Sequence, residues 1–255
     1  MQTIPHYSHF EIDIVSALAS QLSGALDSLE IGQLSRGAID DLPELRGVYQ
    51  LFLNGASVYV GKADNLPRRL RMHHHKISGR NNITVDEMGF KCLSIHENWA
   101  ALAPEKSLID HYKSRLQSEW NGIGFGNNDP GRNRDLTDVD PEGFDMRYPI
   151  RLDWQCDWIE DGEWDVTELL VALKDSSKLP YLLRYYHEGH YKRGHSDYRG
   201  KTVTVPKKGM TSKELLVLIT KALPGWQATA FPSHLILYPE DHAYKHGTVL
   251  HRQPI

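Results

Sequence analysis

The side chains best suited to phosphate chemistry gather between residues 49 and 121 of this chain of 255 residues. Arg69 and His73 are four positions apart in a segment with helical spacing, so their side chains share one helix face. An arginine fork matches phosphate oxygens, and a histidine can move a proton near neutral pH. The pair predicts a phosphate-binding helix edge, and a solvated helix face is the alternative that the pair alone leaves open.

A carboxylate inside an apolar helix stripe is the second chemical signal. On the helix expected from about residue 97 to 116, Glu105 lies within about 65° of Leu108, Ile109 and Tyr112. An unpaired buried carboxylate is costly, so Glu105 should have a cation beside it. A divalent metal suits this role, and one carboxylate plus waters suits Mg²⁺ (or Mn²⁺). An ion pair with a core arginine is the alternative.

Two tyrosines precede these residues in short glycine-containing motifs. Tyr49 ends GVY (47–49), and Tyr59 begins YVG (59–61). Each motif alone is typical of a strand tyrosine packed on a sheet. A free phenol has a pKa of about 10 and is a poor base at neutral pH. A metal and the cationic Arg69 nearby would favour the phenolate.

Local signals predict the elements that would position these side chains. Alternating apolar residues and the hairpin dipeptide Asn54-Gly55 favour two antiparallel strands at 46–53 and 57–61. Asp64-Asn65 can cap a helix at 66–77, and a third strand is expected at 90–95.

Outside this segment the elements are less specific. A helix is expected at 9–30, and a glycine- and asparagine-rich loop at 121–135. Beyond 150, helices are expected at 166–173, 182–186 and after the capping box of Thr211 and Glu214, and strands at 226–231 and 235–238. We therefore divide the chain into an N-terminal helical extension (1–45), a core with its loop (46–148) and a C-terminal α+β region (149–255).

In order and spacing, residues 46–121 resemble the GIY-YIG nuclease superfamily. The match consists of the following positions: Tyr49, Tyr59, Arg69, His73, Glu105 and Trp120-Asn121. Valine replaces isoleucine in both name motifs, which is a conservative departure. The segment GFGNNDPGR (124–132) is similar to the type II restriction endonuclease branch, and so is His73, where the excision-repair branch often has tyrosine.

The resemblance implies a fold and a division of roles. The fold is α+β (α/β), with a small three-stranded antiparallel or mixed sheet flanked by helices. Tyr49 would act as general base, with His73 in proton handling, and Tyr59 would bind the phosphate or the attacking water. Arg69 would stabilise the pentavalent phosphate, Glu105 would hold the metal, and Asn121 would close the site. Cleavage would leave a 5′-phosphate and a 3′-hydroxyl.

DNA contacts are expected from basic and amide side chains around the core. Asparagine pairs well with adenine, and arginine with guanine or phosphate. The candidates are Lys62, Arg68, Lys76, Asn127, Asn128, Arg132, Arg134, Lys192 and Arg193. A structural glycine-rich turn is the alternative for the loop at 121–135.

Composition sets limits on this interpretation. The net charge of −4 counts mildly against DNA, but two basic stretches (62–80 and 192–208) offset an acidic run at 157–168. Only two cysteines occur and no apolar run is long enough to span a membrane, so a cytoplasmic protein is expected.

Three functions follow as hypotheses. The first is a sequence-specific type II restriction-like endonuclease that cuts double-stranded DNA as a homodimer, since one such site cuts one strand. The second is a repair or recombination nuclease that prefers branched or damaged DNA. The third is a non-catalytic DNA-binding module.

Overall fold

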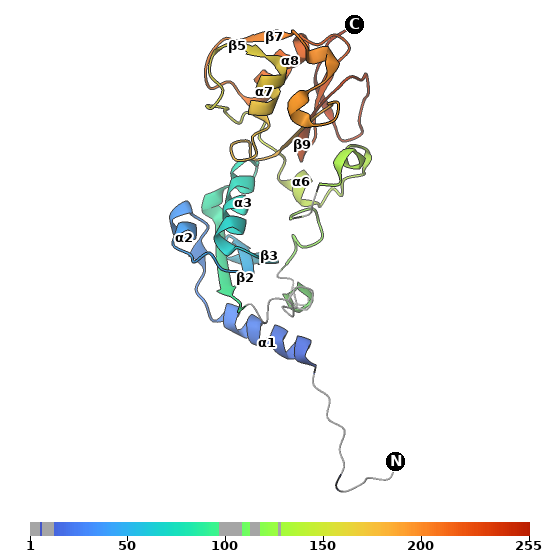
Figure 1. Ribbon diagram of the computed structural model, residues 1–255. Coiled ribbons are helices and arrows are strands. Elements are labelled where there is room, and N and C mark those ends of the chain that lie inside the picture. The colour runs from blue at the N-terminus through green and yellow to red at the C-terminus, as the bar shows by residue number, and fades with distance from the viewer. Residues whose placement is uncertain (1–5, 7–12, 97–108, 113–117, 127–128) are drawn as a thin grey trace, which may run out of the picture. The chain divides into compact units, whose positions relative to one another are not determined.

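The computed structural model describes residue 6 and residues 13–96, 109–112, 118–126 and 129–255 (Figure 1). The chain forms two compact units. The first comprises Met1–Arg71 and Asp86–Asn121, and the second comprises Met72–Val85 and Gly122–Ile255. Residues 122–148, which the sequence assigns to the nuclease core, thus group with the C-terminal region.

The first unit is built on an antiparallel sheet with the strand order β1-β4-β2-β3. Its strands are Gly32–Gln33 (β1), Gly47–Leu53 (β2), Ala56–Ala63 (β3) and Met88–Ser94 (β4). The hairpin between β2 and β3 turns at Asn54 and Gly55, whose φ angles of 50° and 80° are those that a tight hairpin turn requires. The predicted α+β class and three of these strands are confirmed. The sheet nevertheless has four strands rather than the predicted three. The sequence did not predict β1, because its two residues are too few to give a periodic signal.

Helices cover this sheet and begin at polar caps. The helices are Ile14–Asp27 (α1), Arg36–Asp40 (α2) and Leu66–Ser78 (α3), which continues into the second unit. Asp13 caps α1 and accepts a hydrogen bond from the backbone N–H of Ser16. The cap of α3 is Asn65, whose side chain accepts from the N–H of Arg68 at 2.9 Å.

One face of the sheet forms a small apolar core. Val48 of β2 and Val60 of β3 pack with Leu26 of α1 and with Tyr112. Residues 109–112 are helical, and Ile109 packs against the same cluster. These two positions belong to the apolar stripe predicted around Glu105. Glu105 itself, with the rest of the predicted helix 97–108, lies outside the described residues.

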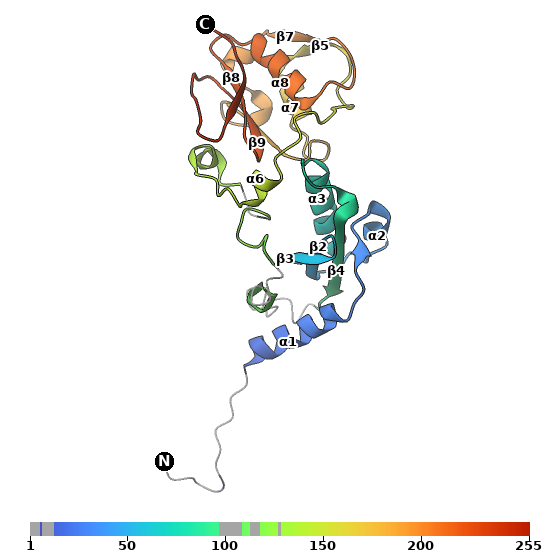
Figure 2. The ribbon, with the colours of Figure 1, turned by 180° about the vertical axis from the view of Figure 1, so that it is seen from behind.

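The second unit has a core of its own. A four-stranded sheet has the order β10-β8-β9-β6, and β5 pairs with β7 in a two-stranded sheet. Figure 2 shows the helices α7 and α8 beside these strands. The elements are Phe144–Arg147 (α6), Gly162–Asp165 (β5), Val166–Leu173 (α7), Leu182–Tyr185 (β6), Thr202–Val205 (β7), Ser212–Lys221 (α8), Gln227–Ala230 (β8), His234–Tyr238 (β9) and Thr248–Arg252 (β10). The described 3₁₀ helices are Val85–Glu87 (η1), Gly131–Leu136 (η2), Tyr191–Arg193 (η3) and Ser196–Tyr198 (η4).

Sequence predictions for this unit succeeded where a local cap or period was present. The helix at 166–173 and the capping box of Thr211 and Glu214 are confirmed. The helix predicted at 182–186 is wrong, since Leu182–Tyr185 forms β6 and pairs in parallel with β9. Its partner lies some fifty residues away in sequence, and a short apolar run alone does not distinguish a strand from a buried helix. None of the described helices is long and apolar enough to span a membrane.

Candidate active site

The two motif tyrosines and the motif arginine meet in the first unit. Arg69 of α3 donates a hydrogen bond from Nε to the Tyr49 hydroxyl oxygen at 3.2 Å. The rings of Tyr49 and Tyr59 lie with their centroids 6.0 Å apart. Both tyrosines are buried, and Arg69 is half-buried. Tyr49 and Arg69 are twenty residues apart in sequence, and they meet because α3 lies on the tyrosine face of the sheet.

For Tyr49 and for Arg69 alike, burial and the charge of the other residue shift the pKa in opposite directions. Burial raises the pKa of Tyr49, the neighbouring Tyr59 raises it further, and Arg69 lowers it by less. Burial would lower the pKa of Arg69, but its interactions with Tyr49 and Tyr59 together outweigh this, so that the pKa of Arg69 lies above the usual value. At neutral pH the described site therefore holds a protonated phenol beside a charged guanidinium. A further positive charge is needed before Tyr49 can act as a base.

The glycines of the two motifs allow these close approaches. A Cβ on Gly61 would lie 2.6 Å from the Tyr49 hydroxyl and 2.8 Å from Tyr59 Cε1. A Cβ on Gly47 would lie 2.0 Å from the Leu93 carbonyl oxygen. Contacts this short do not occur for real Cβ atoms, so any side chain would displace the tyrosines or the neighbouring strand. The glycines thus have a steric reason to be where the motif has them.

Asn121 completes the edge of the sheet. Its side-chain oxygen accepts from the Val60 N–H at 2.9 Å, and its nitrogen donates to the Val60 carbonyl at 2.8 Å. The Trp120 N–H donates to the Val58 carbonyl at 2.8 Å. The amide therefore pairs with the outer edge of β3 as another strand would, next to Tyr59. This placement gives Asn121 a positioning role within reach of the tyrosine cluster.

His73 and Lys76 continue the same helix but belong to the second unit. His73 is only 3% exposed, and its ring stacks on Phe125 with centroids 4.9 Å apart. The Lys76 ammonium lies 4.6 Å from the Phe125 ring centre and 4.9 Å from that of Phe144. Both side chains are engaged with aromatic rings of this unit. Their predicted roles in proton transfer and DNA binding remain predictions.

The metal-binding prediction concerns a residue outside the described part. Glu105 is the predicted ligand, and its placement is not described. Among the described residues, no group of three or more histidine, cysteine, aspartate or glutamate side chains could hold a metal ion. His187, His190 and His195, which are close together in sequence, do not form such a group. The described residues therefore provide no test of fit for a metal.

The predicted DNA contacts are dispersed over both units. Lys62 lies on β3 and Arg68 is exposed on α3, whereas Lys192 and Arg193 are exposed on η3. Asn127 and Asn128 lie outside the described residues. Arg132 is exposed and sits over the Tyr238 ring at 4.4 Å.

Arg134 has a structural partner that its sequence context does not reveal. It donates to Asp145 at 2.6 Å, and Asp145 also accepts from the buried Arg80 at 2.8 Å. Burial would raise the pKa of Asp145, but Arg80, Lys76 and Arg134 hold it below the usual value. Sequence analysis missed this network, because Arg80 and Asp145 are 65 residues apart and belong to no motif.

A second buried carboxylate anchors the same segment to the C-terminal sheet. Asp135 accepts from Arg184 of β6 at 2.8 Å and lies 2.7 Å from His234 Nε2. The Tyr238 hydroxyl also donates to Asp135 at 3.3 Å. Residues 129–136 are therefore held by side chains of β6 and β9. These partners too are distant in sequence and gave no local signal.

Comparisons with known proteins give matches over part of this chain. The family model described as the Eco29kI GIY-YIG domain matches residues 53–140. The protein named UvrABC system protein C of Bacteroides fragilis is 34% identical over 92 residues, covering 34% of this chain and 15% of that protein. Its namesake in Bacteroides thetaiotaomicron is 36% identical over 85 residues, covering 31% and 14%. Each match spans 15% or less of the curated relative's length.

Proposed function

We propose that the chain is a metal-dependent DNA endonuclease, and within that class a sequence-specific type II restriction-like enzyme, because residues 53–140 match the Eco29kI GIY-YIG domain. The contact that carries the proposal is the hydrogen bond between Arg69 and Tyr49. A guanidinium beside a phenol places two functions together: the cation can bind a phosphate, and the phenol oxygen can accept a proton. The double-stranded DNA substrate, a cytoplasmic location and a homodimer belong to the same proposal.

Arg69 is suited to the charge that develops at phosphorus. The group that its Nε contacts is the neutral Tyr49 hydroxyl, whose pKa is raised by burial. The charge of Arg69 is therefore available to an incoming phosphate, and it is already oriented by the Tyr49 hydroxyl. A preorganised donor of this kind stabilises the pentavalent state without rearrangement.

The protonated state of Tyr49 explains why a divalent cation belongs to the proposal. The metal, Mg²⁺ or Mn²⁺, would be held by Glu105 and would supply positive charge at the phosphate. Tyr49 would then take a proton from the attacking water. Tyr59 would orient that water or the phosphate, His73 would pass the proton on, and Asn121 would keep Tyr59 in place. The products would carry 5′-phosphate and 3′-hydroxyl ends.

The second compact unit favours the restriction-like candidate over a general nuclease. Residues 129–136 are rich in charged side chains and are held by Asp135 and Asp145 rather than left free. A fixed surface is what sequence readout needs. The match to the Eco29kI domain extends through this segment to residue 140.

A repair nuclease is the second candidate, since the curated relatives carry the name UvrABC system protein C. The deciding experiment incubates the purified protein and Mg²⁺ with unmethylated phage DNA, and separately with flap and junction DNA. Discrete bands from the phage DNA, with ends that a ligase rejoins, support the restriction-like candidate. Cutting of flaps or junctions combined with intact phage DNA would support the repair candidate instead.

A matched pair of variants tests the chemistry. Tyr49→Phe keeps the ring and removes the hydroxyl, and Glu105→Gln keeps the shape and removes the charge. Both should lose cleavage in Mg²⁺ and in Mn²⁺ while still binding duplex DNA in a gel-shift assay. Wild-type cleavage by Glu105→Gln would refute the metal assignment, and wild-type cleavage by Tyr49→Phe would refute the general base.

A further inference from the structure

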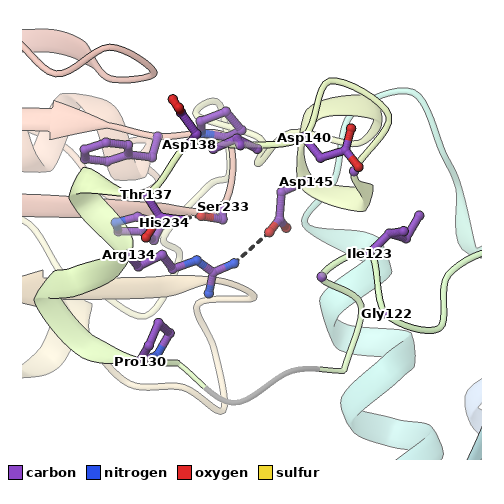
Figure 3. A pocket seen from close by; sticks show the side chains of 15 residues that line it. Gly122, Ile123, Pro130, Arg134, Thr137, Asp138, Asp140, Asp145, Ser233 and His234 are labelled. Atoms are coloured by element: carbon purple, nitrogen blue, oxygen red, sulfur yellow. Dashed lines mark hydrogen bonds and ion pairs between the residues drawn. The ribbon is translucent and has the colours of Figure 1, made fainter.

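A cavity of about 650 Å³ lies within the second unit, beside the segment that we propose reads DNA. Its walls come from three stretches: 122–124, 130–145 and 231–234. Figure 3 shows Arg134 reaching from one side toward Asp145 on the other, with Ser233 and His234 beside it. The pair of Arg134 and Asp145 forms a polar wall of this cavity.

The charges around the cavity disfavour an anionic ligand such as a phosphate. Three carboxylates line it, those of Asp138, Asp140 and Asp145. The one arginine among the lining residues, Arg134, is already paired with Asp145 at 2.6 Å. Arg80 and Arg134 are both paired with Asp145, and Lys245 with Asp138, so a phosphate would find these cations already engaged and would meet the carboxylate of Asp140 as well. The lining therefore favours a neutral ligand, and one that can donate hydrogen bonds to carboxylates.

The remaining lining suits a flat ring. Ile123, Val139, Phe231 and Pro232 contribute apolar surface. Arg134 and Asp145 keep 27% and 10% of their side-chain surface exposed, so donors and acceptors remain accessible beside this apolar surface. A heteroaromatic ring with hydrogen-bonding edges combines these two requirements. The nucleobases of DNA are rings of that kind.

We propose that this cavity receives one nucleobase turned out of the DNA duplex. The proposal rests on the proposed function, since it needs DNA as the ligand. Extruding a base costs a few kcal/mol, which apolar burial and new hydrogen bonds would offset. Carboxylates accept from the amino groups of cytosine, adenine and guanine, whereas thymine has no amino group and offers only its ring N3–H. The cavity therefore favours an amino-bearing base over thymine.

A pocket-filling variant and a matched control give a direct test. Val139→Trp places an indole into the cavity, whereas Leu136→Trp adds the same side chain at a position that is 76% exposed and does not line it. Saturation-transfer NMR with the four 2′-deoxynucleosides measures binding without a phosphate group. We expect an amino-bearing nucleoside to bind the wild type and Leu136→Trp alike, and to bind Val139→Trp about tenfold or more weakly.

The same variants are then tested on DNA. Duplexes with 2-aminopurine at each position of the mapped cleavage site, in Ca²⁺, should show a fluorescence increase at one position with wild type and Leu136→Trp. Val139→Trp should abolish the increase while keeping a wild-type thermal unfolding midpoint. If phage DNA is cut but no nucleoside binds and no position brightens, the base-binding inference fails and the nuclease stands. If no DNA is cut, the nuclease proposal fails, and nucleoside binding still decides the cavity.

Discussion

Arg69 of the first unit and three arginines of the second unit have partners of opposite kind. In the first unit, Arg69 contacts the neutral phenol of Tyr49. In the second unit, Arg80, Arg134 and Arg184 each face a carboxylate at 2.6–2.8 Å. A guanidinium beside a phenol keeps its full charge for a ligand, whereas one beside a carboxylate is largely neutralised. The comparison separates a cation that we propose takes part in the chemistry from cations that hold a loop in place.

Arg80 and Arg69 also differ in how deeply they are buried. Arg80 is 4% exposed, and burial lowers its pKa even though Asp145 acts in the other direction. Arg69 is only half-buried and opens to solvent. Loss of a partner should therefore cost stability in the second unit and activity in the first. The predictions below test this division, beginning with the largest effect.

Removal of the shared carboxylate should have the largest effect on folding. Asp145→Ala leaves Arg80 buried without its counterion, which typically costs about 3–5 kcal/mol. Urea unfolding followed by tryptophan fluorescence measures the loss. Asp138→Ala is the control, because its pair with Lys245 is exposed on both sides and should contribute little. An Asp145→Ala protein as stable as the control would mean that Arg80 does not depend on this network.

Removal of the Arg69 guanidinium should instead affect catalysis. Arg69→Ala should lower the cleavage rate by about 10²–10³-fold, the usual effect of losing one transition-state donor. The unfolding midpoint should stay near the wild-type value, because the partner left behind is a neutral phenol. Arg68→Ala, a neighbouring exposed arginine, should reduce cleavage severalfold at most. Equal losses in the two variants would assign the effect to general attraction of DNA.

The spacing of the tyrosines should tolerate little change. Gly61→Ala pushes a methyl group against both rings, and overpacking of this kind costs about 1–3 kcal/mol. We expect the variant to lose both stability and cleavage. Gly37→Ala in α2 is the control, since a Cβ there meets nothing within 4 Å. Normal cleavage by Gly61→Ala would show that the tyrosine cluster can rearrange without loss.

The same contrast explains what could be predicted from the sequence. The Tyr49 and Arg69 positions were predictable because each belongs to a motif with a local element around it, a strand before a hairpin and a capped helix. The partners of Asp145 and Asp135 were not predictable, because Arg80 is 65 and His234 is 99 residues away. Long-range ion pairs leave no period or cap in the sequence.

Secondary structure followed the same rule. The helix α8 was predicted from the capping box of Thr211 and Glu214, whose hydrogen bonds are local. The strand β6 was predicted as a helix, since its strand character comes from parallel pairing with β9. Arg134 pairs with Asp145, and its predicted contact with DNA remains a prediction. A local contact such as the capping box could be predicted, whereas the parallel pairing of β6, whose partner is distant in sequence, could not.

The smallest expected effect is a pH dependence of stability that comes from His234, the buried histidine beside Asp135. Burial lowers the pKa of His234 below its usual value, although the hydrogen bond to Asp135 acts in the other direction. In the unfolded chain the ring binds a proton near pH 6.5, and in the folded chain only at lower pH. Stability from this residue is therefore fully present above about pH 6.5 and declines as the pH falls below it.

A substitution should flatten this decline. His234→Gln keeps a donor for Asp135 and cannot titrate, so its unfolding temperature should fall less than that of the wild type between about pH 7.5 and 5.5. His190→Gln, at an exposed position, should keep the wild-type decline. Identical declines in all three proteins would mean that the fold does not keep His234 neutral. Below about pH 6.5 a protonated His234 would then join Arg184 in balancing the charge of Asp135.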